Sequence, residues 1–231
     1  MFPYYKPVII IITGFFYKRK MMPQKKKQEP LFITFEGIDG CGKSTQILKT
    51  YQFLQANGLK VKMFREPGST EISEKIRNIL LDKKSDISDI TELLLYEAAR
   101  SEITIKEIQP ALKQGHIVLC DRYYDSTTAY QGYGRKLDIR MVKSLHKVAT
   151  SGLVPDLTFV FDVGLDIAFS RRGKDKDRLE SQSKAFFQRV RAGFLEIARK
   201  ERRRVKRIDA AQPVDKVFED LKQYLVKRLS L

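Results

Sequence analysis

Short apolar segments alternate with longer stretches of helical periodicity along most of this chain. The apolar segments are brief and rich in β-branched and aromatic side chains, which favours buried strands. The predicted strands are 31–36, 60–65, 116–121, 157–162 and 205–209. The predicted helices are 44–57, 70–82, 89–114, 138–151, 164–172, 183–200 and 214–228. Strands that alternate with helices predict an α/β fold, a parallel five-stranded sheet wrapped by helices.

Charged residues end four of the five predicted strands. They are Glu36, Arg65, Asp121 and Asp162. In open parallel sheets, ligands bind beyond the carboxyl ends of the strands. The pattern therefore predicts a polar binding site along one edge of the sheet.

The first 29 residues do not follow this alternation. The apolar run 8–12 is too short to span a membrane, and basic residues follow it where a signal peptide would have small ones. We expect 1–29 to be a disordered extension or to reflect a misassigned start, with Met21 or Met22 as the true first residue. The folded domain is predicted to cover 30–231, without a stable membrane anchor.

A glycine-rich loop links the first predicted strand to the first predicted helix. It reads Gly37-Ile38-Asp39-Gly40-Cys41-Gly42-Lys43-Ser44, and Thr45 follows. This matches the phosphate-binding pattern Gly-x-x-x-x-Gly-Lys-Ser/Thr in the context of a strand, a turn and a helix. Backbone N–H groups and the helix N-terminus would hold the phosphates of ATP, Lys43 would bridge the outer phosphates, and the Ser44 hydroxyl would bind Mg²⁺.

Other polar residues extend this site. Asp121 ends a strand where a carboxylate can hold Mg²⁺, and Arg122 beside it can neutralise phosphate oxygens. Arg65 ends another strand, before a Pro-Gly turn. Tyr96 and Arg100 are four residues apart on a predicted helix, so they share one face and could stack on a base and bond its edge.

Composition and charge limit the alternatives. The formal net charge is +16, and seven of the nine residues in 199–207 are Lys or Arg. Such an excess leaves open a basic ATPase stimulated by RNA or DNA. The two cysteines indicate a reducing compartment, so we expect a cytoplasmic protein. The two histidines, His116 and His146, are too few for a histidine metal site and are interpreted as structural residues.

Seven motifs in order resemble thymidylate kinase, the bacterial type with a basic lid. They are Glu36 to Thr45, Arg65-Glu66-Pro67-Gly68, Tyr96-Glu97-Ala98-Ala99-Arg100, Asp121-Arg122-Tyr123, Ala129-Tyr130-Gln131-Gly132, Asp177-Arg178-Leu179-Glu180 and Ile208-Asp209-Ala210. The resemblance covers about 200 residues, from Leu31 nearly to the C-terminus. It implies a phosphate-loop nucleoside-monophosphate kinase fold and the phosphorylation of dTMP to dTDP with ATP and Mg²⁺.

The resemblance also implies residue roles and a homodimer. The dTMP-binding residues would be Asp39, Arg65, Tyr96, Arg100, Arg122, Ser126, Thr127, Tyr130 and Gln131. The catalytic residues would be Lys43, Arg122, Arg171 and Arg172, the last two in a lid over about 171–182, and the choice between them stays open. The loop 209–213 would border adenine. Another nucleoside-monophosphate kinase remains an alternative, and no specific nucleic-acid partner is expected.

Overall fold

The computed structural model describes residues 28–173 and 177–231. The predicted extension falls almost wholly outside these residues, as do lid residues 174–176. Gln28 is the first described residue, and backbone groups of Lys60 and Gly115 hold its side chain. Its side chain donates hydrogen bonds to the carbonyl oxygens of Lys60 (2.9 Å) and Gly115 (3.0 Å) and accepts one from the Lys60 N–H (2.7 Å).

Five parallel strands form one sheet in the order β2-β3-β1-β4-β5. They are β1 (Leu31–Glu36), β2 (Val61–Arg65), β3 (Ile117–Asp121), β4 (Leu157–Asp162) and β5 (Val205–Asp209). Strands β1 and β4 are buried at every position, because helices cover both faces of the sheet. All five predicted strands are confirmed, with β2 and β3 beginning one residue later than expected.

Helices follow the strands in the predicted order. They are α1 (Lys43–Ala56), α2 (Glu71–Leu81), α3 (Asp89–Ile103), α4 (Gln109–Lys113), α5 (Tyr124–Thr127), α6 (Ile139–Ala149), α7 (Leu165–Ser170), α8 (Lys184–Lys200) and α9 (Val214–Leu229). Side chains of Thr70, Ser88 and Ser183 accept a backbone N–H at the starts of α2, α3 and α8.

Two helical segments differ from the prediction. The single helix expected over 89–114 is α3 and α4 joined by the π-helical turn η1 (Thr104–Ile108). Pro110 has no N–H for α-helical bonding, and the wider turn comes just before it. The helical segment formed by α5 and the π-helix η2 (Thr128–Gly134) was not predicted at all.

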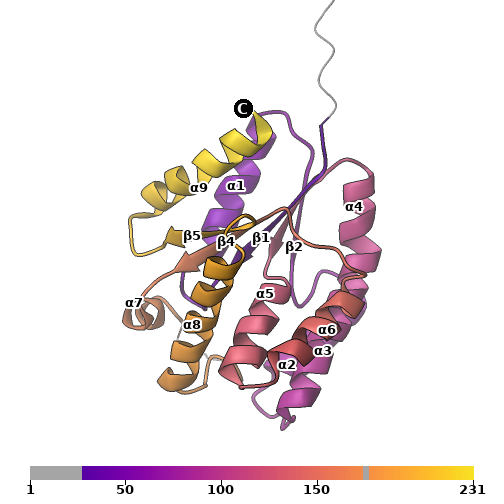
Figure 1. Cartoon of the computed structure of the whole chain (residues 1–231), viewed down its shortest axis with the longest axis vertical. Helices are drawn as coiled ribbons and strands as arrows, with labels where there is room; N and C mark the ends of the chain where they lie inside the picture. Colours follow the sequence, from indigo (N-terminus) through magenta and orange to yellow (C-terminus); the bar gives the residue numbers. More distant parts are fainter. Residues whose placement is uncertain (1–27, 174–176) are drawn as a thin grey trace, which may run out of the picture.

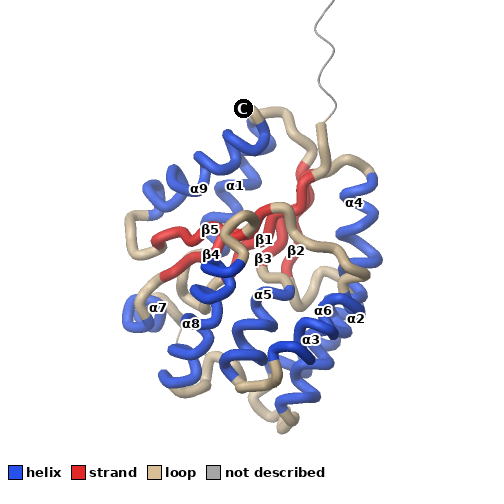
Figure 2. Tube along the Cα trace, in the orientation of Figure 1, coloured by secondary structure: helices blue, strands red, loops and turns tan. Residues whose placement is uncertain are grey.

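The helices cover the sheet on both faces (Figure 1). Helices α1 and α9 pack on one face, against Ile33, Phe35 and Leu119. The other face holds a second cluster in which Phe32, Val118 and Cys120 pack with residues of α3 and α4. Figure 2 shows the loops at the carboxyl ends of the strands meeting between α7 and α2. That edge is where the candidate site lies.

Candidate active site

The phosphate loop joins β1 to α1 in a backbone shape that depends on glycine. Gly40 and Gly42 have positive φ angles of 81° and 93°. A Cβ on Gly40 would lie 2.1 Å from the carbonyl oxygen of Ala168 in α7, so only glycine fits there. Helix α1 begins at Lys43, so the free backbone N–H groups of its first turn face the loop. The loop is therefore preshaped as an anion cradle.

Lys43 lies inside this loop and is only 6% exposed. Its ammonium donates to the carbonyl oxygens of Gly37 (3.0 Å) and Ile38 (3.2 Å) and contacts the Cys41 sulfur at 3.7 Å. These contacts fix the ammonium inside the loop.

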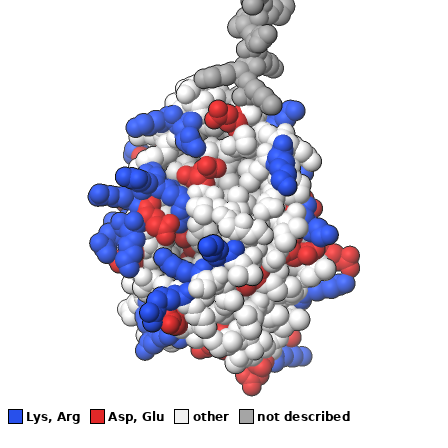
Figure 3. All heavy atoms as spheres, turned by 45° about the vertical axis from the view of Figure 1, so that its right-hand side comes forward, with Lys and Arg blue, Asp and Glu red and all other residues white. Residues whose placement is uncertain are grey.

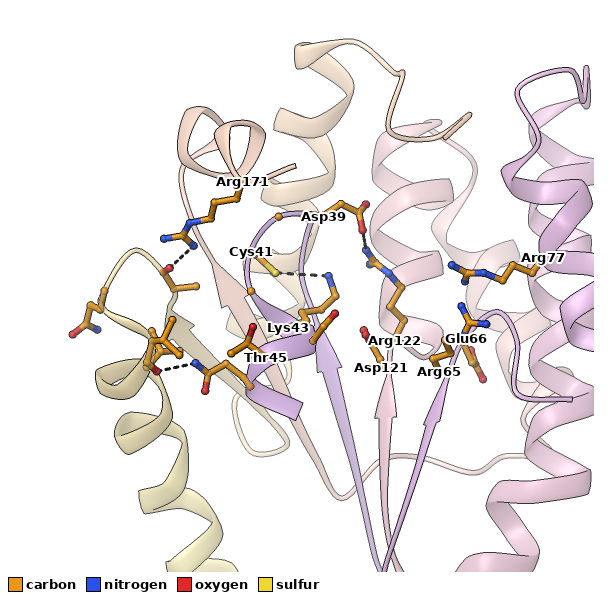
Figure 4. A pocket seen from close by; sticks show the side chains of 18 residues that line it. Asp39, Cys41, Lys43, Thr45, Arg65, Glu66, Arg77, Asp121, Arg122 and Arg171 are labelled. Carbon is orange, nitrogen blue, oxygen red and sulfur yellow. Dashed lines mark hydrogen bonds and ion pairs between the residues drawn. The ribbon is translucent and has the colours of Figure 1, made fainter. Parts of the chain in front are cut away.

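A cleft of about 620 Å³ opens in front of the loop (Figure 4). It is lined by Asp39 to Gln46, Arg65, Glu66, Arg77, Asp121, Arg122, Arg171, Ala210, Gln212, Val214 and Val217. Arg171 donates to the carbonyl oxygen of Ala210 at 3.1 Å, which joins the start of the lid to the 209–213 loop. The structure thus brings the phosphate loop, the end of β3 and the predicted adenine loop around one space.

A smaller pocket of about 80 Å³ adjoins the cleft. Its lining includes eight of the nine residues that the sequence resemblance assigns to dTMP; the ninth, Arg65, lines the larger cleft. The eight are Asp39, Tyr96, Arg100, Arg122, Ser126, Thr127, Tyr130 and Gln131. The remaining wall is Glu66, Pro67, Arg77, Leu81, Asp177 and Leu179. Residues from six separate segments of the chain therefore converge on this pocket.

Asp39 and Arg122 line both spaces and lie where the two meet. Arg122 donates one terminal nitrogen to Gly37 O (2.9 Å) and Ser126 Oγ (3.0 Å), and the other to Asp39 Oδ1 (2.5 Å). Tyr130 also donates its hydroxyl to Asp39, at 3.0 Å. Partial burial alone would raise the pKa of Asp39, but the charges of Arg122 and Lys43 outweigh it and hold that pKa well below its usual value. Asp39 is therefore ionised throughout the neutral pH range.

Arg122 itself has an uncommon backbone conformation. Its φ angle is 70°, in the left-handed region that favours glycine. Its N–H donates to Phe35 O at 2.9 Å, which ties the turn after β3 to the end of β1. Strained residues of this kind persist where surrounding contacts fix them, often in binding sites.

Arg100 is more enclosed than the sequence suggested. Its side chain is 2% exposed, and it is paired with Glu66 at 2.8 Å and with Glu97 at 2.8 Å. It also donates to the carbonyl oxygen of Tyr123 at 3.3 Å. The guanidinium thus reaches the pocket as a fixed group held by buried carboxylates.

The other predicted arginines differ in placement. Arg65 is half exposed, and one of its terminal nitrogens donates to both carboxylate oxygens of Glu74, at 2.9 and 3.0 Å. Arg172 lines neither space; it lies between the rings of Phe169 and Phe187 and donates to the backbone oxygen of Asp39 at 3.0 Å. In this arrangement Arg171 is the lid arginine that faces the cleft.

Arg77 is a site residue that the sequence analysis missed. It extends from α2 toward Arg122 from the opposite side of the junction and lines both spaces (Figure 4). It donates to Pro67 O at 2.9 Å, and burial together with the nearby charge of Arg65 lowers its pKa. Its place two turns into the helix that follows the Arg65 to Gly68 motif was the available signal. Leu179 and Asp177 of the lid also line the smaller pocket.

The described residues limit how a metal would bind. They contain no cluster of three or more His, Cys, Asp or Glu side chains that could hold an ion alone. Ser44 and Asp121 both line the cleft and offer one hydroxyl and one carboxylate. Oxygen donors in this small number suit Mg²⁺, which takes its other ligands from phosphates and water.

Comparison with known proteins assigns the family. The family model described as "Thymidylate kinase" matches residues 35–221. The chain belongs to the thymidylate kinase family. A thymidylate kinase from Thermoanaerobacter sp. (strain X514) is 44% identical over 199 residues, which cover 86% of this chain and 98% of that one. A thymidylate kinase from Dehalococcoides mccartyi is 47% identical over 195 residues, covering 84% and 94%.

A solved structure agrees with this family assignment. The crystal structure of thymidylate kinase from Ehrlichia chaffeensis superposes with a TM-score of 0.70 at 37% identity, covering 85% of this chain and 98% of that one. The predicted family and the phosphate-loop α/β fold are both confirmed. The comparisons give no support to the alternative of a nucleic-acid-stimulated ATPase or of a kinase for another nucleotide.

Proposed function

We propose that this chain transfers the γ-phosphoryl group of ATP to dTMP, forming dTDP and ADP. The observation that supports this most is the junction of two spaces of different character at Asp39 and Arg122. One space holds the phosphate loop, and the other is small and lined by Tyr96 and Arg100. A donor and an acceptor bound there would meet with their phosphates end to end.

The donor half would hold ATP. Amides from Gly40 to Thr45 would bind its phosphates, Lys43 would bridge the outer ones, and Ala210 and Gln212 lie where adenine would be bordered. Ser44 and Asp121 would hold Mg²⁺, directly or through water. Bound Mg²⁺ would offset negative charge on the β- and γ-phosphates.

The acceptor half would hold dTMP. Tyr96 would stack on thymine, and Arg100 would bond its edge from its fixed position. Tyr130 would pack under the sugar, with Asp39 near the 3′-hydroxyl. Ser126, Thr127 and Gln131 complete the wall, and Arg65 would approach the monophosphate from the side of the cleft.

The chemistry would rest on positioning and positive charge. The acceptor phosphate is largely dianionic near pH 7, since its second pKa is about 6, and it needs no general base. Repulsion between the two anions is the main barrier, and Lys43, Arg122 and a lid arginine would offset it. Arg171 faces the cleft in this structure and is the lid residue we favour, with Arg172 holding the backbone of Asp39. Asp177 and Leu179 line the acceptor pocket, and a lid that closed there would exclude water.

A nucleotide panel tests this function. ADP formation would be measured with dTMP, dUMP, UMP, CMP, AMP and GMP as acceptors, and with single-stranded RNA in place of an acceptor. We expect dTMP to give the highest kcat/KM and RNA to give no stimulation. A better ribonucleotide acceptor, or turnover that depends on RNA, would contradict the proposal.

We further propose that the protein is a homodimer that pairs through helices α2, α3 and α6. Exposed apolar side chains lie along these neighbouring helices and the adjoining η1: Ile72, Ile79, Ile90, Leu94, Ile105, Met141 and Val148. Figure 3, which brings this side of the molecule forward, shows a broad area with few charges. Exposed apolar surface of this extent is typical of a protein interface.

Light scattering during gel filtration tests the dimer. The native chain should elute at twice the monomer mass of 26.8 kDa, and Leu94→Glu should elute as a monomer. Leu48→Glu is the matched control, because Leu48 on α1 is 48% exposed, against 49% for Leu94, and faces away from α3. A native monomer, or dimers of all three proteins, would refute this interface.

The N-terminal extension is proposed to be dispensable. Removing residues 1–27 keeps the Gln28 contacts and should leave kcat and KM unchanged; a loss of activity would show that the extension contributes to the site. Among residues 28–173 and 177–231, no helix has the length and apolar character needed to cross a membrane. Cys41 and Cys120 are both free thiols, which supports the proposed location in the reducing cytoplasm.

A further inference from the structure

A chain of buried polar side chains leads from helix α6 to the acceptor pocket. His146 on α6 contacts Glu97 on α3, with 2.7 Å between Nδ1 and Oε1. The same Oε1 accepts a hydrogen bond from Arg100 at 2.8 Å. His146, Glu97 and Arg100 are 6%, 5% and 2% exposed, so water contributes little to these contacts. His146 lines neither of the two spaces of the candidate site.

The contacts of His146 define its protonation. The carboxylate of Glu97 only accepts hydrogen bonds, so Nδ1 carries a proton and donates it. Nε2 lies 2.8 Å from the hydroxyl of Thr128, which can donate to it. A neutral imidazole satisfies both partners. Burial lowers the pKa of His146, although its bond to Glu97 opposes this, and the neutral form is favoured. The ring also stacks on Tyr124, with centroids 5.4 Å apart.

His146 and Arg100 hold the carboxylate of Glu97 through one of its two oxygens. Its second oxygen, Oε2, is buried without a hydrogen-bond partner in the structure. Both hydrogen bonds of the carboxylate therefore fall on Oε1, one from His146 and one from Arg100. Without the imidazole, the carboxylate could rotate about its last torsion, and Arg100 would lose a fixed partner on one side. Glu66 and the longer contact with the carbonyl oxygen of Tyr123 would then be left to orient the guanidinium.

We propose that His146 is a positioning residue for base recognition: it holds Glu97, and Glu97 fixes Arg100 against the edge of the bound base. This inference rests on the proposed function, in which Arg100 contacts the thymine of dTMP. It assigns to α6 a part in substrate selection, although no side chain of α6 lines the pocket. The histidine would act on acceptor binding and leave the ATP side unchanged.

His146→Leu is the direct test, because leucine fills the space of the ring but cannot donate to Glu97. Loss of one hydrogen bond to a charged group should raise the KM for dTMP about tenfold, with kcat and the KM for ATP within about twofold of native. Preference for dTMP over dCMP, which differs at the base edge, should fall by a similar factor. His146→Asn keeps a donor near the Nδ1 position and should restore the KM to within about threefold of native.

Thr128→Val provides a second route if His146→Leu does not fold. Valine is nearly isosteric with threonine, and it removes the hydroxyl that holds the imidazole ring at Nε2. The KM for dTMP should rise by about threefold to tenfold, with the KM for ATP unchanged.

The outcomes separate the two proposals. If the native chain fails to phosphorylate dTMP, the proposed function is wrong. If the native chain is active but His146→Leu lowers the melting temperature and kcat without changing the KM for dTMP, His146 is only structural. The inference is also overturned if the asparagine variant loses dTMP affinity as fully as the leucine variant.

Discussion

Replacing Arg122 by lysine keeps the positive charge at the junction of the two nucleotide spaces but removes the fork of the guanidinium. One terminal nitrogen of Arg122 now contacts Gly37 O and Ser126 Oγ, and the other contacts Asp39 and the Tyr130 hydroxyl. A lysine ammonium is a single point with three donors and cannot occupy both positions at once. Arg122→Lys therefore tests whether geometry, in addition to charge, supports transfer.

The expected loss follows from the contacts. Lysine would keep the stronger side, toward Asp39, and would give up at least one hydrogen bond on the side of Gly37 and Ser126. A hydrogen bond to a charged group contributes about 1.5–3 kcal/mol, so kcat should fall roughly 10- to 150-fold. Arg122→Ala removes the charge as well and should cost about 10³-fold or more in kcat.

A coupled assay of ADP formation with saturating ATP and dTMP measures this effect, and a thermal melt checks that each variant is folded. Arg191→Lys is a suitable control, because Arg191 is a partly exposed arginine that pairs with Asp162 at 2.7 Å and lines neither space. That variant should keep native activity. If Arg122→Lys has a kcat within about twofold of native, the positioning argument for this residue is wrong.

Three further predictions concern other groups of the site. Lys43→Ala should lower kcat by about 10³-fold or more while the far-UV circular dichroism stays native; near-normal turnover would remove Lys43 from the mechanism. Arg100→Ala should lower the free energy of unfolding in urea by about 3–5 kcal/mol, because Glu66 and Glu97 lose their buried cation; an unchanged midpoint would contradict the buried pairs. The kcat/KM for dTMP should fall below about pH 6, where the acceptor phosphate takes up a proton. Asp39 is already ionised there, since its pKa lies below the usual value, so Asp39→Asn should not shift that midpoint, and a shift would assign the transition to the protein.

The strands of the sheet could be predicted because each is marked by the side chains of its own few residues. The middle strands β1 and β4 are buried on both faces, so they appear in the sequence as continuous apolar runs. The phosphate loop was equally clear, since its glycines and the Lys43-Ser44 pair are adjacent in the chain. The order of the strands followed from neither pattern and is known from the structure alone.

The helical segment formed by α5 and η2 could not be predicted from its own residues. Threonines and two glycines between Thr127 and Gly134 give it poor helix propensity. It is helical because it packs tightly on α8. A Cβ on Gly134 would lie 2.7 Å from Phe186, and one on Gly193 would lie 2.8 Å from the ring of Tyr133. Tertiary packing therefore overrides the intrinsic preference of these residues.

The sequence predicted which residues belong to the site better than it predicted the contacts between them. Family motifs supplied most of the residues around the acceptor pocket, but Arg77 lies outside those motifs and was missed. The partners of Arg100 could not be read from the chain, because Glu66 is 34 positions away and its pairing depends on how α3 packs beside the end of β2. Contacts of this kind are determined by tertiary structure.

In the proposed reaction, the phosphates of ATP and dTMP meet end to end beside Lys43 and Arg122. The most direct test of this arrangement is inhibition by a single molecule in which adenosine and thymidine are joined through five phosphates. The structure predicts that this compound competes with ATP and also with dTMP, because it would occupy the cleft and the smaller pocket together. Competition with ATP alone, at any concentration of dTMP, would show that the two spaces do not form one continuous site.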